Sequence, residues 1–289
     1  MEMSTPLAIA ITGANSGIGL RATTRLAAAG HTVFALCRDV ERSRETISAA
    51  TAGAPNVEII HADLSDPESI LRASADLVAR GPLDSLINNA AVFDLNQKTA
   101  AFTPGGHEVF WATNHLGPFE LTARLSPALA QSSRPRVVFV ASKGLVVMPR
   151  LTIRFDDLDS PTWYSPTKAY YHAKLAQVMT AVSLAEKVPN TVRVTCIRVP
   201  AVRLDAARIA TQPRLMRALY APKNATSTDP DLLGATYERA ATRDAASSEL
   251  YLNEDDKPVA LPAAARDVSQ RERLWTITQE VVGSPTWAW

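Results

Sequence analysis

Tyr170 and Lys174, four residues apart in one segment, are the side chains of this sequence best suited to moving a proton. Residues at i and i+4 are neighbours on one face of a helix. A free tyrosine has a pKa near 10, and a neighbouring ammonium favours the phenolate. Acid–base work near neutral pH requires the pKa of Tyr170 to fall by roughly three units, and we expect Lys174 to supply much of this shift. Ser142, which ends an apolar run, is expected to bind and orient the oxygen of a substrate.

A second pair with the same spacing, Tyr164 and Lys168, lies just upstream, so spacing alone does not choose between them. Pro166 suits the first position of a helix, and the residue before a proline is kept out of the helical region. We therefore expect the helix to begin there. This places only the later pair, Tyr170 and Lys174, inside the helix.

A glycine-rich segment follows the first apolar run and is expected to open the first helix. In a dinucleotide site, Gly13 would allow the tight turn, Gly17 the close approach of the backbone to a phosphate, and Gly19 the contact between helix and strand. The helix N-terminus would attract the pyrophosphate. The expected binding residues are Gly13, Asn15, Ser16, Gly17, Ile18 and Gly19.

The choice between NAD and NADP depends on the end of the second predicted strand, about 20 residues beyond the glycines. Arg38 follows this strand, and its guanidinium matches a 2'-phosphate, which favours NADP over NAD. Asp39 is the alternative, because a register shift of one residue would place a carboxylate there instead. Asp63, after the third strand, is expected to bond the adenine amino group or, alternatively, to cap the next helix.

The elements that must position these residues follow an alternation of strands and helices. Seven short, β-branched, apolar runs predict buried parallel strands at 7–12, 31–37, 57–61, 83–88, 136–141, 191–198 and 249–252. Five crossover helices are predicted at 17–29, 40–51, 66–79, 106–131 and 166–187. Residues 144–165 and 200–229 fit neither period and are expected to form long loops near the strand ends, where ligands bind. The fold class is therefore α/β.

Composition restricts the class of protein and of partner. A chain of 289 residues with 46% hydrophobic content suits one large domain, 1–289. We expect a cofactor half at about 1–140 and a catalytic and substrate-loop half at about 141–289. Thirty basic residues nearly balance 29 acidic ones, so the expected partner is a small molecule, with no nucleic acid and no membrane. Without a signal sequence or an apolar run of roughly 20 residues, we expect a soluble, cytoplasmic protein.

Other catalytic classes fit the sequence poorly. Residues 140–144 lack the first glycine of a hydrolase nucleophile elbow. His107 and Glu108 are followed by no second histidine at the spacing of a zinc helix, so no metal is expected. The two cysteines, Cys37 and Cys196, lie inside predicted strands and are expected to be reduced core thiols.

The chain resembles the short-chain dehydrogenase/reductase family through a set of motifs in the right order. These are residues 12–19, 88–91, Asn114, Ser142, Tyr170 with Lys174, and Pro200. Within the family it looks most like the retinol dehydrogenase and protochlorophyllide reductase branch, through residues 37–38, 114–119, 174–176 and 273–280.

The resemblance implies a doubly wound Rossmann-type domain with a mostly parallel seven-stranded sheet and helices on both faces. It implies a catalytic tetrad in which Tyr170 is the acid and base, Lys174 tunes it and holds ribose, Ser142 binds the reacting oxygen, and Asn114 anchors a water relay. It also implies cofactor contacts at Leu64, Asn89, Ala90, Pro200 and Val202. Members of the family often pair through the helices that hold Asn114 and Tyr170, and the sequence leaves a homo-oligomer open.

The chain departs from the family pattern at Ala91, Ala173 and Ala201. Ala201 stands where glycine usually follows the proline, in a turn that would line the nicotinamide pocket and need unusual backbone angles. This departure favours, to a small extent, a redox-silent protein that binds a cofactor or metabolite.

The function expected from these features is an NADP-dependent oxidoreductase that interconverts a carbonyl and an alcohol, in the reductive direction. A nucleotide-sugar epimerase or dehydratase and a redox-silent binding protein or isomerase are the alternatives. The expected apolar substrate walls are Leu145, Val146, Val147, Met148, Trp163 and Leu219, which favours a bulky, partly hydrophobic substrate. Basic residues in the predicted loops indicate either an anionic substrate or a solvated face: Lys143, Arg203, Arg208, Arg214, Arg217 and Lys223.

Overall fold

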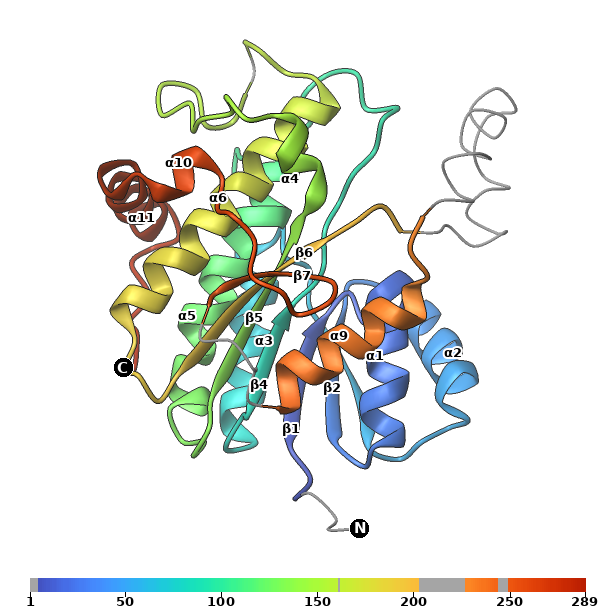
Figure 1. Ribbon diagram of the computed structural model, residues 1–289. Coiled ribbons are helices and arrows are strands. Elements are labelled where there is room, and N and C mark those ends of the chain that lie inside the picture. Colours follow the sequence, from blue (N-terminus) through green and yellow to red (C-terminus); the bar gives the residue numbers. More distant parts are fainter. Residues whose placement is uncertain (1–4, 161, 203–226, 244–248) are drawn as a thin grey trace.

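A seven-stranded sheet forms the middle layer of the computed structural model, which describes residues 5–160, 162–202, 227–243 and 249–289 (Figure 1). Its order is β3-β2-β1-β4-β5-β6-β7, and every pairing is parallel. The strands are β1 (Ala8–Thr12), β2 (Thr32–Cys37), β3 (Val57–His61), β4 (Ser85–Asn88), β5 (Arg136–Ser142), β6 (Arg193–Val199) and β7 (Tyr251–Asn253). Each lies where the sequence predicts a strand, with its ends shifted by a residue or two. The predicted α/β, Rossmann-type sheet is confirmed, and it is entirely parallel.

Helices cover both faces of this sheet, and each face has its own apolar core (Figure 1). One face carries α1 (Gly17–Ala28), α2 (Val40–Thr51) and α9 (Pro230–Thr242), and α1 packs against both of the others. The other carries α3 (Pro67–Ala79), α5 (Gly117–Leu129) and α6 (Pro166–Lys187). α9 was not predicted. Gly234 in its middle lets it approach α1, since a Cβ there would lie 2.8 Å from the Cβ of Arg21.

The segment predicted as one helix over 106–131 consists of three pieces. α4 (Val109–Trp111) begins where the Glu108 carboxylate accepts a hydrogen bond from the Trp111 amide, at 2.9 Å. A π-helical turn, Ala112–Leu116, separates α4 from α5. The prediction of a continuous α-helix is therefore wrong. Such π turns occur often at functional sites, and this one contains Asn114.

The C-terminal part of the chain packs over the outer side of α6 (Figure 1). It comprises α10 (Ala263–Arg266) and α11 (Val268–Val281). Its tryptophans cluster on Phe119 of α5, with ring centroids 4.9 Å away for Trp275 and 5.4 Å for Trp287. Every residue of α6 from 172 to 184 is buried. α6 therefore lies enclosed between the sheet and the C-terminal helices.

The two predicted loops are described to different extents. Residues 144–165 have no regular structure apart from the short 3-10 helix Lys143–Val147, as predicted, with residue 161 undescribed. Most of the loop at 200–229 lies outside the described residues, including Leu219 and the cations Arg203, Arg208, Arg214, Arg217 and Lys223. No helix in the described part of the chain is long and apolar enough to cross a membrane.

Candidate active site

The carboxyl ends of β1 and β4 meet at the point where the strand order reverses, which is where doubly wound sheets bind dinucleotides. The Thr12 hydroxyl accepts hydrogen bonds from the amides of Asn89, at 3.0 Å, and Ala90, at 2.9 Å. The Asn89 side chain in turn donates to the Thr12 carbonyl, at 2.8 Å. These bonds fix the segment after β4 against the glycine turn after β1.

The glycine turn has two positions whose backbone angles favour glycine and a third with no room for a side chain. Gly13 has φ +66° and Gly17 has φ +53°, both in the left-handed region that favours glycine. A Cβ on Gly19 would lie 2.2 Å from the Gly13 carbonyl oxygen. Ser16 is the exposed N-cap of α1, and its hydroxyl makes no capping bond. With no acidic residue in the first turn of α1, the amides of Ile18 and its neighbours are well placed to bind an anion.

We expect Gly19→Ala to weaken dinucleotide binding and to cost about 1–3 kcal/mol in the free energy of unfolding, because the added methyl overlaps the Gly13 carbonyl. Fluorescence titration with NADPH and urea unfolding measure the two effects. Gly105→Ala is the matched control, since the nearest atom to its Cβ is the Thr103 hydroxyl at 3.7 Å. Equal behaviour of the two variants would contradict the tight turn.

Arg38 is exposed directly after β2, beside the glycine turn. Its neighbour Asp39 is the N-cap of α2, and the carboxylate accepts a hydrogen bond from the Arg42 amide at 3.0 Å. Asn15 reaches the same region and donates to the Ser43 hydroxyl at 2.7 Å. Of the two candidates for cofactor selection, Arg38 is thus the one whose side chain is not used to cap the helix.

Asp63 and Leu64 follow β3 at the same edge of the sheet. The Asp63 carboxylate accepts hydrogen bonds from the amide and the hydroxyl of Ser65, at 2.9 and 2.6 Å. α3 is capped by Asp66, so the alternative that Asp63 caps this helix is wrong. Leu64 is buried, and its carbonyl lies against Gly117, where a Cβ would come within 2.2 Å.

The Tyr170 hydroxyl and Ser142 lie together at the carboxyl end of β5. Burial raises the pKa of Tyr170 above its usual range, Tyr171 raises it further, and a side-chain hydrogen bond with Ser142 opposes both. The Ser142 hydroxyl also accepts a hydrogen bond from the Gly144 amide, at 3.2 Å. The ring of Phe93 packs 4.5 Å from that of Tyr170. In this geometry the phenol is neutral at neutral pH and can donate its proton.

The Lys174 ammonium is bonded to strand β5 and to its own helix. It donates to the Val140 carbonyl, at 2.8 Å, and to the Gln177 side-chain oxygen, at 2.9 Å. The side chain is 1% exposed, and burial lowers its pKa to about 8. The spacing of Tyr170 and Lys174 in the sequence predicts that this ammonium lowers the pKa of Tyr170. In the structure the ammonium is bonded to Gln177, one turn further along α6, a partner that the Tyr170–Lys174 spacing does not indicate.

Asn114 is fully buried in the π turn and binds the backbone after β4 with both ends of its amide. It donates to the Val92 carbonyl, at 3.0 Å, and accepts from the Val92 amide, at 2.8 Å. These two bonds fix the backbone at Val92, next to Phe93, whose ring packs on that of Tyr170.

Pro200, Ala201 and Val202 follow β6, on the opposite side of β5 from the glycine turn. Val202 forms a parallel bridge with Thr228, whose amide donates to the Ala201 carbonyl at 2.9 Å. Ala201 is not among the residues with positive φ. Its methyl therefore causes no strain of the kind expected where a glycine is replaced.

Comparison with known proteins shows to which family the chain belongs. A family model described as short chain dehydrogenase matches residues 7–152. The chain belongs to the short-chain dehydrogenase family. Among curated relatives of this short-chain dehydrogenase, retinol dehydrogenase 12 from Bos taurus is 32% identical over 280 residues, which cover 95% of this chain and 86% of the relative. The chain is accordingly an NAD(P)-dependent oxidoreductase of this family.

Solved structures share the fold of this short-chain dehydrogenase. An uncharacterized protein from Mycobacterium Paratuberculosis matches with a TM-score of 0.72 at 24% identity, over 100% of this chain and 99% of that one. A metagenomic short-chain oxidoreductase, solved in complex with NADP, matches with a TM-score of 0.63 at 22% identity, over 88% of this chain and 98% of that one.

The residues of this short-chain dehydrogenase fit a nicotinamide dinucleotide. The glycine turn has positive φ angles and no space for side chains, the Ser16 hydroxyl is uncommitted, and Arg38 is exposed beside them. The neutral phenol of Tyr170 lies at the same edge of the sheet, two strands away from β1.

Lys174→Met tests how the buried ammonium affects the stability of this short-chain dehydrogenase, and the test needs no measurement of turnover. Burial lowers the pKa of Lys174 from 10.5 to about 8. Below pH 8, where the side chain is protonated in both the folded and the unfolded chain, this shift reduces the free energy of unfolding by up to about 3 kcal/mol. The penalty shrinks as pH rises from 8 to 10.5, because the folded chain loses the proton first. We expect the variant to be more stable than the wild type at pH 7, with a smaller difference at pH 10.

Urea unfolding at the two pH values measures this difference. The exposed Lys257 provides the control, and Lys257→Met should leave the stability and its pH dependence nearly unchanged. A Lys174→Met variant that is less stable than the wild type at pH 7 would show that the bonds to Val140 and Gln177 outweigh the burial penalty.

Proposed function

We propose that this protein is an NADP-dependent oxidoreductase that interconverts a carbonyl and an alcohol on a bulky, partly hydrophobic small molecule, in the reductive direction. The observation that carries the proposal is the neutral Tyr170 phenol beside the Ser142 hydroxyl, at the sheet edge that also holds the glycine turn. A phenol and a serine hydroxyl together can hydrogen-bond a single carbonyl oxygen and then protonate it.

In the proposed reaction, Ser142 donates a hydrogen bond to the substrate oxygen and holds it near Tyr170. A bound nicotinamide supplies the hydride. Tyr170 donates its proton to the oxygen as negative charge develops there, and its raised pKa suits this role because the proton is present throughout the neutral range. Asn114 keeps the segment that carries Phe93 in place through its bonds to Val92.

Lys174 has two proposed roles, to bind the ribose hydroxyls and to lower the pKa of Tyr170. Both require its ammonium to leave the Val140 carbonyl and Gln177. Its pKa of about 8 keeps most of the side chain protonated at neutral pH, so three donors are present when it moves. After Tyr170 has given up its proton, the ammonium in this position would stabilise the phenolate until the phenolate takes a proton from solvent.

NADP is the proposed cofactor because Arg38 is the exposed cation after β2 while Asp39 caps α2. A guanidinium binds a 2'-phosphate through charge-assisted, bidentate hydrogen bonds. The metagenomic short-chain oxidoreductase that shares the fold was solved with NADP, which agrees with this choice.

The proposed substrate class rests on the apolar surface around Tyr170. Phe93 packs on the Tyr170 ring with the ring centroids 4.5 Å apart, and its side chain is 45% exposed. Exposed apolar side chains beside a reactive group favour a substrate with apolar bulk. The name of the relative retinol dehydrogenase 12 points to the same class.

Turnover of NADPH with a panel of aldehydes and ketones, including a retinoid aldehyde, tests the proposal. Consumption of NADPH that depends on the carbonyl supports it, and faster consumption of NADH than of NADPH would contradict the cofactor choice. Tight binding of NADPH with no turnover on any member of the panel would support instead a redox-silent protein.

A further inference from the structure

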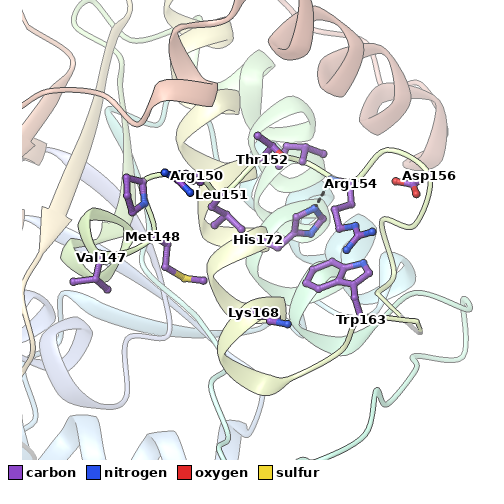
Figure 2. Close-up of a pocket in the computed structure, with 12 residues that line it drawn as sticks. Val147, Met148, Arg150, Leu151, Thr152, Arg154, Asp156, Trp163, Lys168 and His172 are labelled. Carbon is purple, nitrogen blue, oxygen red and sulfur yellow. Dashed lines mark hydrogen bonds between the residues drawn. The ribbon is translucent and has the colours of Figure 1, made fainter.

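A cavity of about 680 Å³ lies beside the N-terminal turns of α6, under the loop that follows Ser142. Figure 2 shows Val147 and Met148 to one side of α6 and Arg154 and Trp163 to the other, with Lys168 and His172 on the helix between them. This volume lies within the range of roughly 300–1,000 Å³ that is typical of small-molecule sites.

The cavity is separate from the candidate active site. Lys168 and His172 line it, whereas Tyr170, which lies between them in the sequence, does not. Successive residues of an α-helix are about 100° apart, so Lys168 and His172 share one face of α6 and Tyr170 lies nearly opposite. The contacts agree, because His172 stacks on Trp111, with centroids 4.9 Å apart, while Tyr170 meets Ser142 and Phe93.

Basic side chains outnumber acidic ones in the lining of the cavity. Arg150, Arg154 and Lys168 line it, against the single acidic residue Asp156. All three cations are exposed, and none forms an ion pair with a carboxylate elsewhere in the described part of the chain.

His172 adds no charge to the cavity at neutral pH. Burial, and then the positive charge of Arg154, lower its pKa to about 4 against the opposing effect of Asp157 and Asp159. Its Nε2 accepts a hydrogen bond from the Arg154 amide, at 3.0 Å, which requires the unprotonated nitrogen. This bond fixes the backbone of the loop to α6.

Apolar groups make up the rest of the wall, with Met148, Leu151 and the indole of Trp163. The indole is held in place. Its Nε1 donates to the Asp157 carbonyl at 3.2 Å, its ring meets His172 edge-on at 5.0 Å, and the Arg154 guanidinium lies 5.5 Å from the ring centroid. A fixed aromatic surface beside unpaired cations suits a ligand that has a flat or alkyl body and one negative group.

We propose that this cavity binds an amphipathic organic anion, a carboxylate or sulfonate on an aromatic or alkyl body, at a site distinct from that of the cofactor and the reacting carbonyl. The anionic group lies beside Arg154 and Lys168, and the apolar body lies against the indole of Trp163.

Isothermal titration of the full chain with three probes of matched shape tests the charge requirement. The probes are 2-naphthalenesulfonate, the neutral 2-naphthalenemethanol and the cationic 2-naphthyl-trimethylammonium. We expect the sulfonate to bind roughly 10-fold or more tightly than the other two, because hydrogen bonds to charged groups are the stronger ones. Equal affinity for all three probes, or no binding of the sulfonate, overturns the proposal.

Variants then locate the site. Arg154→Gln with Lys168→Gln is expected to weaken sulfonate binding by roughly 10-fold or more, and Trp163→Leu to weaken it as well. The double variant Arg134→Gln with Lys257→Gln removes two exposed cations away from the cavity and is expected to bind as the wild type does. Equal weakening by both double variants would show that the sulfonate responds only to net charge, which contradicts the proposal.

Competition separates this site from the proposed active site. Saturating NADPH, and the Tyr170→Phe substitution, are expected to leave sulfonate binding unchanged. Displacement of the sulfonate by NADPH would place it in the cofactor site and overturn the proposal. Because binding is measured without turnover, this result is independent of whether the chain reduces any carbonyl.

Discussion

Tyr170→Phe is expected to lower kcat for NADPH-dependent carbonyl reduction by roughly 10²–10⁴-fold, the range usual for the loss of a general acid. The ring and its packing on Phe93 remain, so the affinity for NADPH should stay close to that of the wild type. What disappears is the proton that the substrate oxygen needs as the carbonyl is reduced. Steady-state turnover, with NADPH binding followed separately by fluorescence, distinguishes loss of the proton donor from loss of the cofactor.

The neighbouring Tyr171 provides the matched control for this substitution. Its hydroxyl lies against Gly144, and its ring packs on that of Tyr170 at 5.2 Å. Tyr171→Phe removes the same atom one residue away and should keep turnover near the wild-type level. Similar losses in the two variants would show that packing, and not proton transfer, explains the effect.

The pH dependence of the wild type should follow the same reasoning. A donor must be protonated, and the raised pKa of Tyr170 means that the proton is present through the neutral range and is lost only on the alkaline side. Reduction is therefore expected to be flat around neutral pH and to fall as pH rises. A rate of reduction that already decreases as pH rises from acidic values to neutral would contradict the assignment of Tyr170 as the proton donor.

Arg38→Gln is expected to weaken NADPH binding by roughly 10–100-fold while changing NADH binding little. A hydrogen bond to a charged group contributes about 1.5–3 kcal/mol, and the guanidinium after β2 is the cation proposed to meet the 2'-phosphate. Fluorescence titration of the wild type and of Arg38→Gln with NADPH and NADH gives the ratio of the two nucleotide affinities for each protein.

Arg42→Gln, on the first turn of α2, removes a nearby exposed charge and serves as the control. It should reduce both affinities only slightly. If the wild type binds NADH more tightly than NADPH, the proposed role of Arg38 is wrong. An equal loss in the two variants would indicate general electrostatic attraction in place of a specific contact.

The strands could be predicted from the sequence because each is a short apolar run, covered on both faces of a parallel sheet. The helices α9 and α11 were not predicted, for different reasons. α11 buries only Arg271, Leu274 and Thr278, so its sequence has a weak apolar stripe and its formation depends on tertiary contacts. α9 carries a start signal that the prediction missed, since Asp229 caps it and Pro230 occupies its first turn.

Some parts of the candidate site could be predicted from the sequence and others could not. The positions of the glycine turn and Ser142 follow from strand ends, and that of Tyr170 follows from the helix start at Pro166; the sequence indicates both well. The direction of Lys174 does not follow from either, because a long side chain chooses among several partners, and Gln177 offers an acceptor one turn away. The π turn around Asn114 also leaves no periodic signal, since it adds a residue inside an otherwise helical segment.

The enclosure of α6 has a consequence for how the protein works. A helix packed on all sides through residues 172–184 cannot tilt or slide without disrupting the cores beside it. The Tyr170 phenol, which α6 carries, is therefore expected to keep its position during the proposed reaction. The groups that react are held by a packed helix, whereas the residues that select the substrate are expected on the loops that follow the strand ends.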